Sequence, residues 1–106
     1  MKNDLEKDVE AYLVAKVRKL GGRCLKFVSP GNAGVPDRIL LFPQGVVIFV
    51  ETKRPRGSVV ASRQKVWHER LRRLGFRTEF IYDKAAVDMF TEGLEIFGTG
   101  GQIERF

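Results

Sequence analysis

The chain has 106 residues, of which 43% are hydrophobic, and its formal net charge is +6. This length and hydrophobic content exclude a disordered chain and predict one folded domain over residues 1–106, while the basic balance favours a polyanionic partner, with nucleic acid the best fit. A single cysteine, Cys24, excludes an internal disulfide, and with only one histidine beside it there is no set of zinc ligands.

The first predicted element is an amphipathic helix over residues 4–20. Its apolar side chains recur at helical spacing, and Gly21 and Gly22 end it. Asn3 and Glu6 read as a capping pair, with Asn3 at the N-cap. Glu10 lies one turn after Glu6 on the same face, so either carboxylate could reach toward a neighbouring sheet.

A strand over residues 23–28 leads into a loop over residues 29–36, which holds two glycines and two prolines and is closed by Asp37. Two further strands, residues 38–42 and 46–50, are joined by a tight turn at residues 43–45. The second of these strands is wholly apolar and is followed at once by Glu51, Thr52 and Lys53. Charged side chains at the end of a buried strand need a partner.

The spacing of Asp37, Glu51 and Lys53 suits metal-dependent phosphodiester hydrolysis. Side chains alternate along a strand, so Glu51 and Lys53 share a face, and Asp37 should begin the neighbouring strand. Two carboxylates, with the Thr52 carbonyl, would form an oxygen-rich site for Mg²⁺ or Mn²⁺. A bland alternative is a turn aspartate and a surface ion pair, but the apolar run before Glu51 favours a functional carboxylate.

The second half of the chain predicts a helix over residues 62–74, a strand over 77–82 and a short helix over 84–92. The inward face of the longer helix is expected to carry Gln64, Trp67, Leu71 and Leu74, which leaves His68 on the surface. A basic set is expected to track DNA phosphates by shape rather than by base contacts. Its candidates are Lys26, Arg54, Arg56, Arg63 and Lys65, of which Arg54 and Arg56, closest in sequence to Glu51 and Lys53, are the best.

Several of these segments resemble a known nuclease superfamily. Pro36-Asp37 followed by Glu51-Thr52-Lys53 resembles the PD-(D/E)xK nucleases. More narrowly, the run from Gly34 to Arg38, the run from Phe49 to Lys53 and the later Gln64 resemble the VRR-NUC family, the virus-type replication-repair nucleases, over roughly residues 4–83. The resemblance implies an α/β, restriction-endonuclease-like fold, with a mixed β-sheet flanked by helices and an α-β-β-β-α-β core.

The resemblance also implies a function, a metal-dependent DNA endonuclease acting on branched DNA such as Holliday junctions or flaps in replication, repair or recombination. It places a metal-associated carboxylate on the first helix, for which Glu6 matches better than Glu10, and it gives Gln64 a place in the active site, holding water or phosphate. Stand-alone members resemble phage and bacterial resolvases, which implies a homodimer. Residues 90–97 and 46–49 are the candidate dimer surfaces.

Two other function classes remain open on the sequence. One is a non-catalytic nucleic-acid-binding module, and the other is a nuclease subunit that needs a partner protein for targeting. The N-terminus shows no signal peptide, and no apolar run approaches the ~20 residues of a membrane helix. We therefore expect a cytoplasmic protein, in a bacterial or phage-infected host cell.

Overall fold

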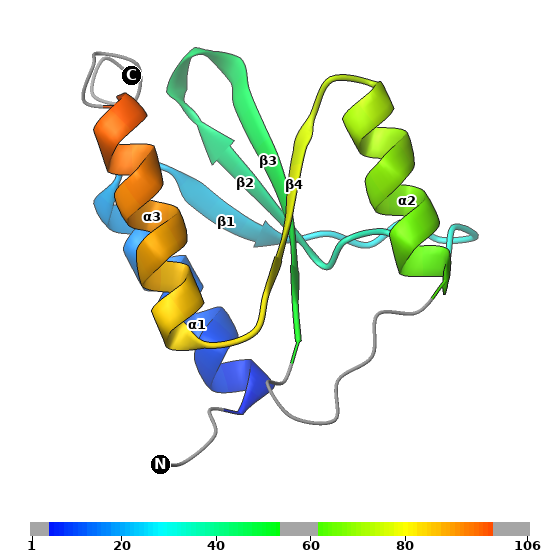
Figure 1. Ribbon diagram of the computed structural model, residues 1–106, viewed down its shortest axis with the longest axis horizontal. Coiled ribbons are helices and arrows are strands. Elements are labelled where there is room, and N and C mark those ends of the chain that lie inside the picture. Colours follow the sequence, from blue (N-terminus) through cyan, green and yellow to red (C-terminus); the bar gives the residue numbers. More distant parts are fainter. Residues whose placement is uncertain (1–4, 54–61, 99–106) are drawn as a thin grey trace.

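The computed structural model describes residues 5–53 and 62–98, and it contains the predicted elements in the predicted order (Figure 1). They are α1 (Glu6–Lys19), β1 (Arg23–Lys26), β2 (Arg38–Phe42), a 3-10 turn η1 (Pro43–Gly45), β3 (Val46–Thr52), α2 (Ser62–Arg73), β4 (Arg77–Ile81) and α3 (Lys84–Gly98). Within these described ranges, no helix is both long enough and apolar enough to cross a membrane.

The four strands form one mixed sheet in the order β1-β2-β3-β4. β2 is antiparallel to both β1 and β3, and β4 runs parallel to β3. A parallel pair requires a crossover connection, which α2 provides. The predicted mixed sheet flanked by helices is confirmed.

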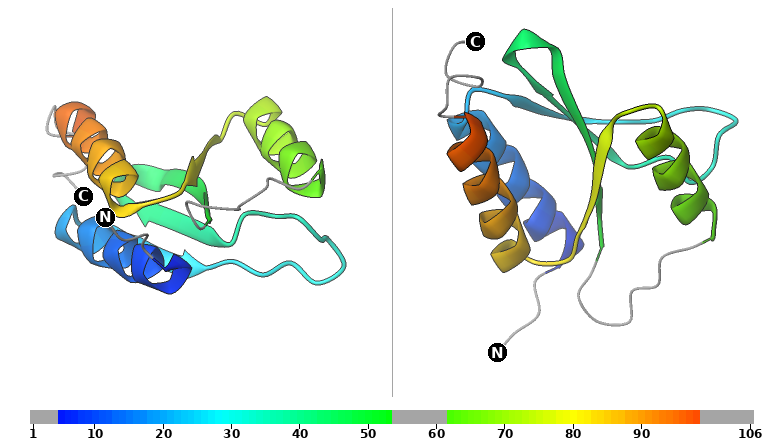
Figure 2. Two further views of the ribbon diagram at one scale, coloured as in Figure 1. Left: turned by 60° about the horizontal axis from the view of Figure 1, so that its bottom comes forward. Right: turned by 45° about the horizontal axis from the view of Figure 1, so that its top comes forward.

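The main core lies between one face of the sheet and the paired helices α1 and α3 (Figures 1 and 2). Helix α1 contributes Val9, Leu13 and Val17, which are fully buried and spaced four residues apart along one helix face. Alternate strand residues, such as Leu40 and Val50, project from the sheet into the same cluster. Burial of this cluster fixes α1 against the sheet.

Helix α2 packs on the opposite face of the sheet, and its rotation about its own axis differs from the prediction. His68 is buried, with 1% of its surface exposed, and its ring stacks on Phe80 with centroids 3.9 Å apart. Leu74 lies beyond the end of α2 and is 72% exposed. The predicted surface histidine and inward leucine are therefore wrong. Each helix residue turns about 100°, so a helix packed through Gln64, His68 and Leu71 leaves Leu74 outside.

Helix α3 is longer than predicted, since it runs to Gly98 instead of ending near residue 92. Gly93 sits inside the helix and does not end it. Phe90 and Leu94 are 7% and 6% exposed and belong to the core. These two side chains cannot form the dimer surface predicted over residues 90–97, and the side chains of residues 95–97 lie outside what is described. In the other predicted dimer surface, Ile48 and Phe49 are also buried.

Candidate active site

The candidate site lies where β2 begins and β3 ends. Because Arg38 pairs with Val50 in antiparallel register, Asp37 and Glu51 are next to the last pair, one on each strand. The side chain of Asp37 turns toward β3, where its Oδ1 accepts a hydrogen bond from the Thr52 amide at 3.3 Å. The sequence prediction that Asp37 and Glu51 come close together agrees with this register.

Thr52 joins Asp37 to helix α1. Its buried hydroxyl lies 3.0 Å from Asp37 Oδ2 and 3.0 Å from Glu10 Oε2. A hydroxyl has one proton to donate, so it can serve only one of these two carboxylates at a time. The sequence predicts a role for the Thr52 carbonyl, and the structure adds the Thr52 hydroxyl. A threonine alternating with the buried Val50 on the core face was the signal that its hydroxyl needs a partner.

Three carboxylates cluster around this point. Glu6, Glu10 and Asp37 each offer an oxygen, and these oxygens lie within 4.8 Å of one another. Arg38 offsets part of the negative charge through an ion pair to Glu10 Oε1 at 3.2 Å. The N-cap of α1 is Leu5, and Glu6 is the first helical residue, so the predicted capping pair is wrong. Both glutamates that the sequence left as alternatives face Asp37.

Glu51 lies on the face of the sheet that α2 covers. The side chain is 6% exposed, and its Oε2 accepts a hydrogen bond from Gln64 Nε2 at 3.0 Å. Its Oε1 is buried and has no hydrogen-bond partner among the described residues. Burial, and next the charge of Asp37, raise the pKa of Glu51 to about 7, while the charge of Lys53 acts in the lowering direction. The sequence predicted Gln64 on the inward edge of this helix, and the structure adds that its amide bonds Glu51.

Asp37 also carries a raised pKa, of about 6. Burial is the main cause, the two hydrogen bonds from Thr52 act in the lowering direction, and the neighbouring Glu10 acts in the raising direction. The half-buried Asp37 and the buried Glu51, both with raised pKa values, mark a site where negative charge accumulates without enough compensation.

These residues fit a divalent cation. The donor set consists of oxygens alone, which suits Mg²⁺ or Mn²⁺, and Glu51 Oε1 is a buried acceptor with no described partner. The carboxylates that lie closest together are Asp37 with Glu6 and Glu10, so α1 contributes more than the sequence prediction of Asp37, Glu51 and the Thr52 carbonyl assigned to it.

Mg²⁺ is expected to raise the melting temperature by roughly 5 °C or more at pH 8, and by much less at pH 5. The folded protein holds protons on Asp37 and Glu51 up to about pH 6 and 7, whereas unfolded carboxyls lose them near pH ~4. The metal-free fold therefore loses stability as the pH rises through this window, and a cation restores it. His68, with its pKa lowered to about 4 by burial, contributes the opposite slope. Thermal denaturation with Mg²⁺ or EDTA measures the shift.

Two matched variants assign the carboxylates of α1 in the same assay. Glu10→Gln and Glu6→Gln make the same chemical change at two positions, four residues apart on one helix. We expect the larger loss of the Mg²⁺ shift for Glu10, which already bonds Thr52 and Arg38. Equal shifts at pH 5 and pH 8 in the unaltered protein would contradict the link between the cation and these two acids.

The structure places three of the five predicted DNA-contact residues. Lys26 is exposed at the end of β1, opposite Arg38 in the strand register. Arg63 and Lys65 are exposed on the first turn of α2, beside Gln64. Arg54 and Arg56 lie outside the described residues.

Comparison with known proteins adds a family relationship. The chain is 50% identical over 70 residues to "Putative nuclease p44" of Acyrthosiphon pisum secondary endosymbiont phage 1, an alignment that covers 66% of this chain and 74% of the phage protein. A solved structure of a VRR_NUC domain superposes with a TM-score of 0.77 at 31% identity, covering 82% of this chain and 94% of that one. No family model matches the chain.

Proposed function

The chain belongs to the VRR-NUC family, and from this premise we propose that it is a Mg²⁺- or Mn²⁺-dependent DNA endonuclease. The observation that carries the proposal is the meeting of Asp37, Glu10 and Glu6 beside the buried, incompletely paired Glu51. A module that only bound DNA would gain nothing from acids placed next to a polyanion, because they would repel it.

The residues of the chain divide the work. Asp37, Glu10 and Glu6, with Glu51, would hold the cation, which when bound offsets charge on the phosphate and lowers the pKa of water. The Thr52 hydroxyl lies between Asp37 and Glu10 and donates to one of them at a time, and the Thr52 carbonyl is a further candidate ligand.

Lys53 and Gln64 complete the proposed site. Lys53 follows Glu51 on the same strand face and offers a positive charge to the phosphate oxygens as negative charge develops there. Gln64 is a positioning residue, because its amide holds Glu51 Oε2, and it could also hold water or a phosphate oxygen. The basic residues Lys26, Arg63 and Lys65, with Arg54 and Arg56, would contact the DNA backbone.

We further propose branched DNA as the substrate, such as Holliday junctions or flaps in replication, repair or recombination. The described surface carries basic residues around the acids but no recognition helix, which supports shape recognition. A homodimer would place two cuts symmetrically about a junction.

The test is cleavage of labelled duplex, single-strand, flap, splayed-arm and four-way-junction DNA with Mg²⁺, Mn²⁺ or EDTA. We expect cutting with either cation, none with EDTA, and the fastest rate on a branched substrate. Paired cuts in the four-way junction would support the homodimer. Tight binding without cutting of any substrate would overturn the proposal in favour of a binding module or a partner-dependent subunit.

A further inference from the structure

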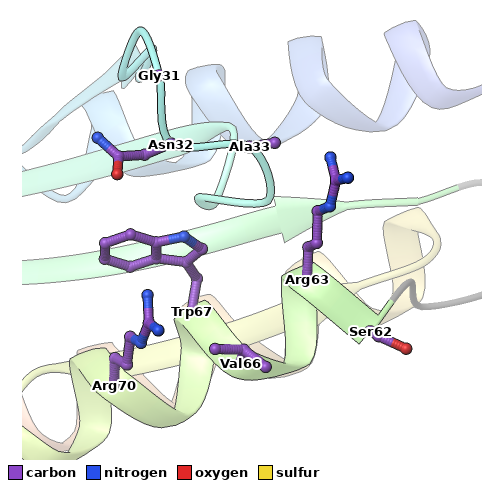
Figure 3. Close-up of a pocket in the computed structure, with 8 residues that line it drawn as sticks. All are labelled: Gly31, Asn32, Ala33, Ser62, Arg63, Val66, Trp67 and Arg70. Carbon is purple, nitrogen blue, oxygen red and sulfur yellow. The ribbon is translucent and has the colours of Figure 1, made fainter.

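A cavity, separate from the acids, opens between helix α2 and the loop that precedes Asp37. Its volume is about 480 Å³, within the roughly 300–1,000 Å³ typical of small-ligand pockets. Figure 3 shows Trp67 and Arg63 projecting from α2 toward this loop. The lining residues are Gly31, Asn32, Ala33, Ser62, Arg63, Val66, Trp67 and Arg70.

The residues that line this cavity suit the binding of a nucleotide. Trp67, the only tryptophan in the chain, is half-buried and offers an aromatic surface. The Arg70 guanidinium lies 5.0 Å from the centroid of its ring. Arg63 and Arg70 flank Trp67 along the helix, one turn away on either side, and Val66 is 45% exposed at the rim. Nucleic-acid bases stack on aromatic rings, and arginine side chains bind phosphate groups.

The loop that forms the wall opposite α2 approaches the helix closely at Gly34. Gly34 adopts φ +98°, and a Cβ atom there would meet the Arg63 carbonyl carbon at 2.7 Å. The loop is tied internally by the Asn32 side chain, which donates to Ser29 Oγ at 2.9 Å. This loop leads directly into Asp37, so it connects the wall of the pocket to the acids along the chain.

The cavity lies about one helical turn along α2 from the residue that contacts the acids. Gln64 bonds Glu51, and Trp67 is three residues later on the same helix, roughly 4.5 Å further along its axis.

We propose that this pocket binds an unpaired nucleotide next to the scissile phosphate, with its base against Trp67 and its flanking phosphates against Arg63 and Arg70. The inference rests on the proposed nuclease function and names the feature of branched DNA that is recognised. A base inside a duplex is covered on both faces by its neighbours, so only an unpaired base can reach the indole.

The sole tryptophan makes the pocket directly observable. With EDTA present, so that the strand stays intact, titration with a single-stranded oligonucleotide should quench the Trp67 fluorescence, whereas a blunt duplex of the same length should quench it at least fivefold less. Equal quenching by both, or tight single-strand binding with no quenching, overturns the proposal. Neither result depends on cleavage, so failure here is distinguishable from failure of the nuclease proposal.

Variants on α2 provide the second measurement. Trp67→Leu should weaken binding of a labelled single strand about five- to a hundredfold, the range of one lost base stack, and Trp67→Phe should restore most of it. Arg70→Gln should weaken single-strand binding more than duplex binding, whereas the matched Arg72→Gln, which changes an exposed arginine outside the pocket, should weaken both alike. If Arg70→Gln and Arg72→Gln have the same effect on both DNAs, the pocket does not bind a nucleotide. This comparison holds even if the Trp67 variants do not fold.

Discussion

Replacing Asp37 with asparagine is expected to lower the cleavage rate at least about a thousandfold while leaving the fold intact. The substitution keeps an acceptor oxygen for the Thr52 amide, so the local hydrogen bond survives. It removes the one carboxylate that both faces Glu6 and Glu10 and raises the pKa of Glu51. A thousandfold loss corresponds to about 4 kcal/mol of transition-state stabilisation, a reasonable share for a cation that offsets phosphate charge.

The stability of this variant carries a second, independent signature. Asp37 has a pKa raised to about 6, so its ionised form is unfavourable in the metal-free fold. Metal-free Asp37→Asn should therefore melt at or above the temperature of the unaltered protein at pH 8, and it should lose the Mg²⁺ shift. Few substitutions that abolish activity raise stability, and those that do usually relieve strain built into an active site.

The control is Asp8→Asn, the same chemical change at an exposed position in the first turn of α1. It should leave both the single-turnover cleavage rate and the Mg²⁺ shift near their original values. If Asp37→Asn instead cleaves within tenfold of the unaltered protein, Asp37 does not hold the cation, and the cluster on α1 is a structural feature of the sheet end.

The position of the acids could be read from the sequence because it depends on strand periodicity and register alone. Asp37 precedes one strand and Glu51 ends the next, and an antiparallel hairpin brings those two ends together whatever packs around them. The same reasoning could not choose between Glu6 and Glu10. Both lie on one helix face, and their distance from Asp37 depends on how Val9, Leu13 and Val17 seat α1 on the sheet.

The rotation of α2 shows the limit of helical periodicity. Its hydrophobic side chains are few, so the periodicity predicts Trp67 on the buried face with Gln64 and Leu71, whereas the tertiary fold buries His68, stacked on Phe80. A histidine is buried in this way only because a neighbouring strand supplies an aromatic ring, which the local sequence does not reveal. Because His68 instead of Trp67 is fully buried, Trp67 lies at the edge of α2, where it faces the loop and is open to a ligand.

Lys53→Met is expected to lower the turnover rate about a hundred- to a thousandfold without weakening cation binding. Lys53 is held at the end of β3 by a backbone hydrogen bond to the Ile81 carbonyl at 2.9 Å, and it shares a strand face with Glu51. Methionine keeps the length of the side chain but removes the charge. The loss of one well-placed donor to developing negative charge costs about this much in other enzymes.

The pH–rate profile of the residual activity of Lys53→Met should also shift to higher pH. The charge of Lys53 lowers the pKa of Glu51, so its removal lets that pKa rise further above 7. The activity that requires ionised Glu51 should therefore appear at a higher pH in Lys53→Met than in the unaltered protein. A pH–rate profile under single-turnover conditions measures this alkaline displacement.

The Mg²⁺ shift separates the roles of Lys53 and Asp37. Lys53→Met should keep the full shift in melting temperature that Asp37→Asn loses, because the lysine acts on the phosphate and the aspartate on the cation. Lys7→Met, an exposed position on α1, controls for the loss of one positive charge. Cleavage by Lys53→Met at the rate of Lys7→Met would reduce Lys53 to a surface charge, and the developing charge on the phosphate would then have to be met by the cation and the arginines of α2.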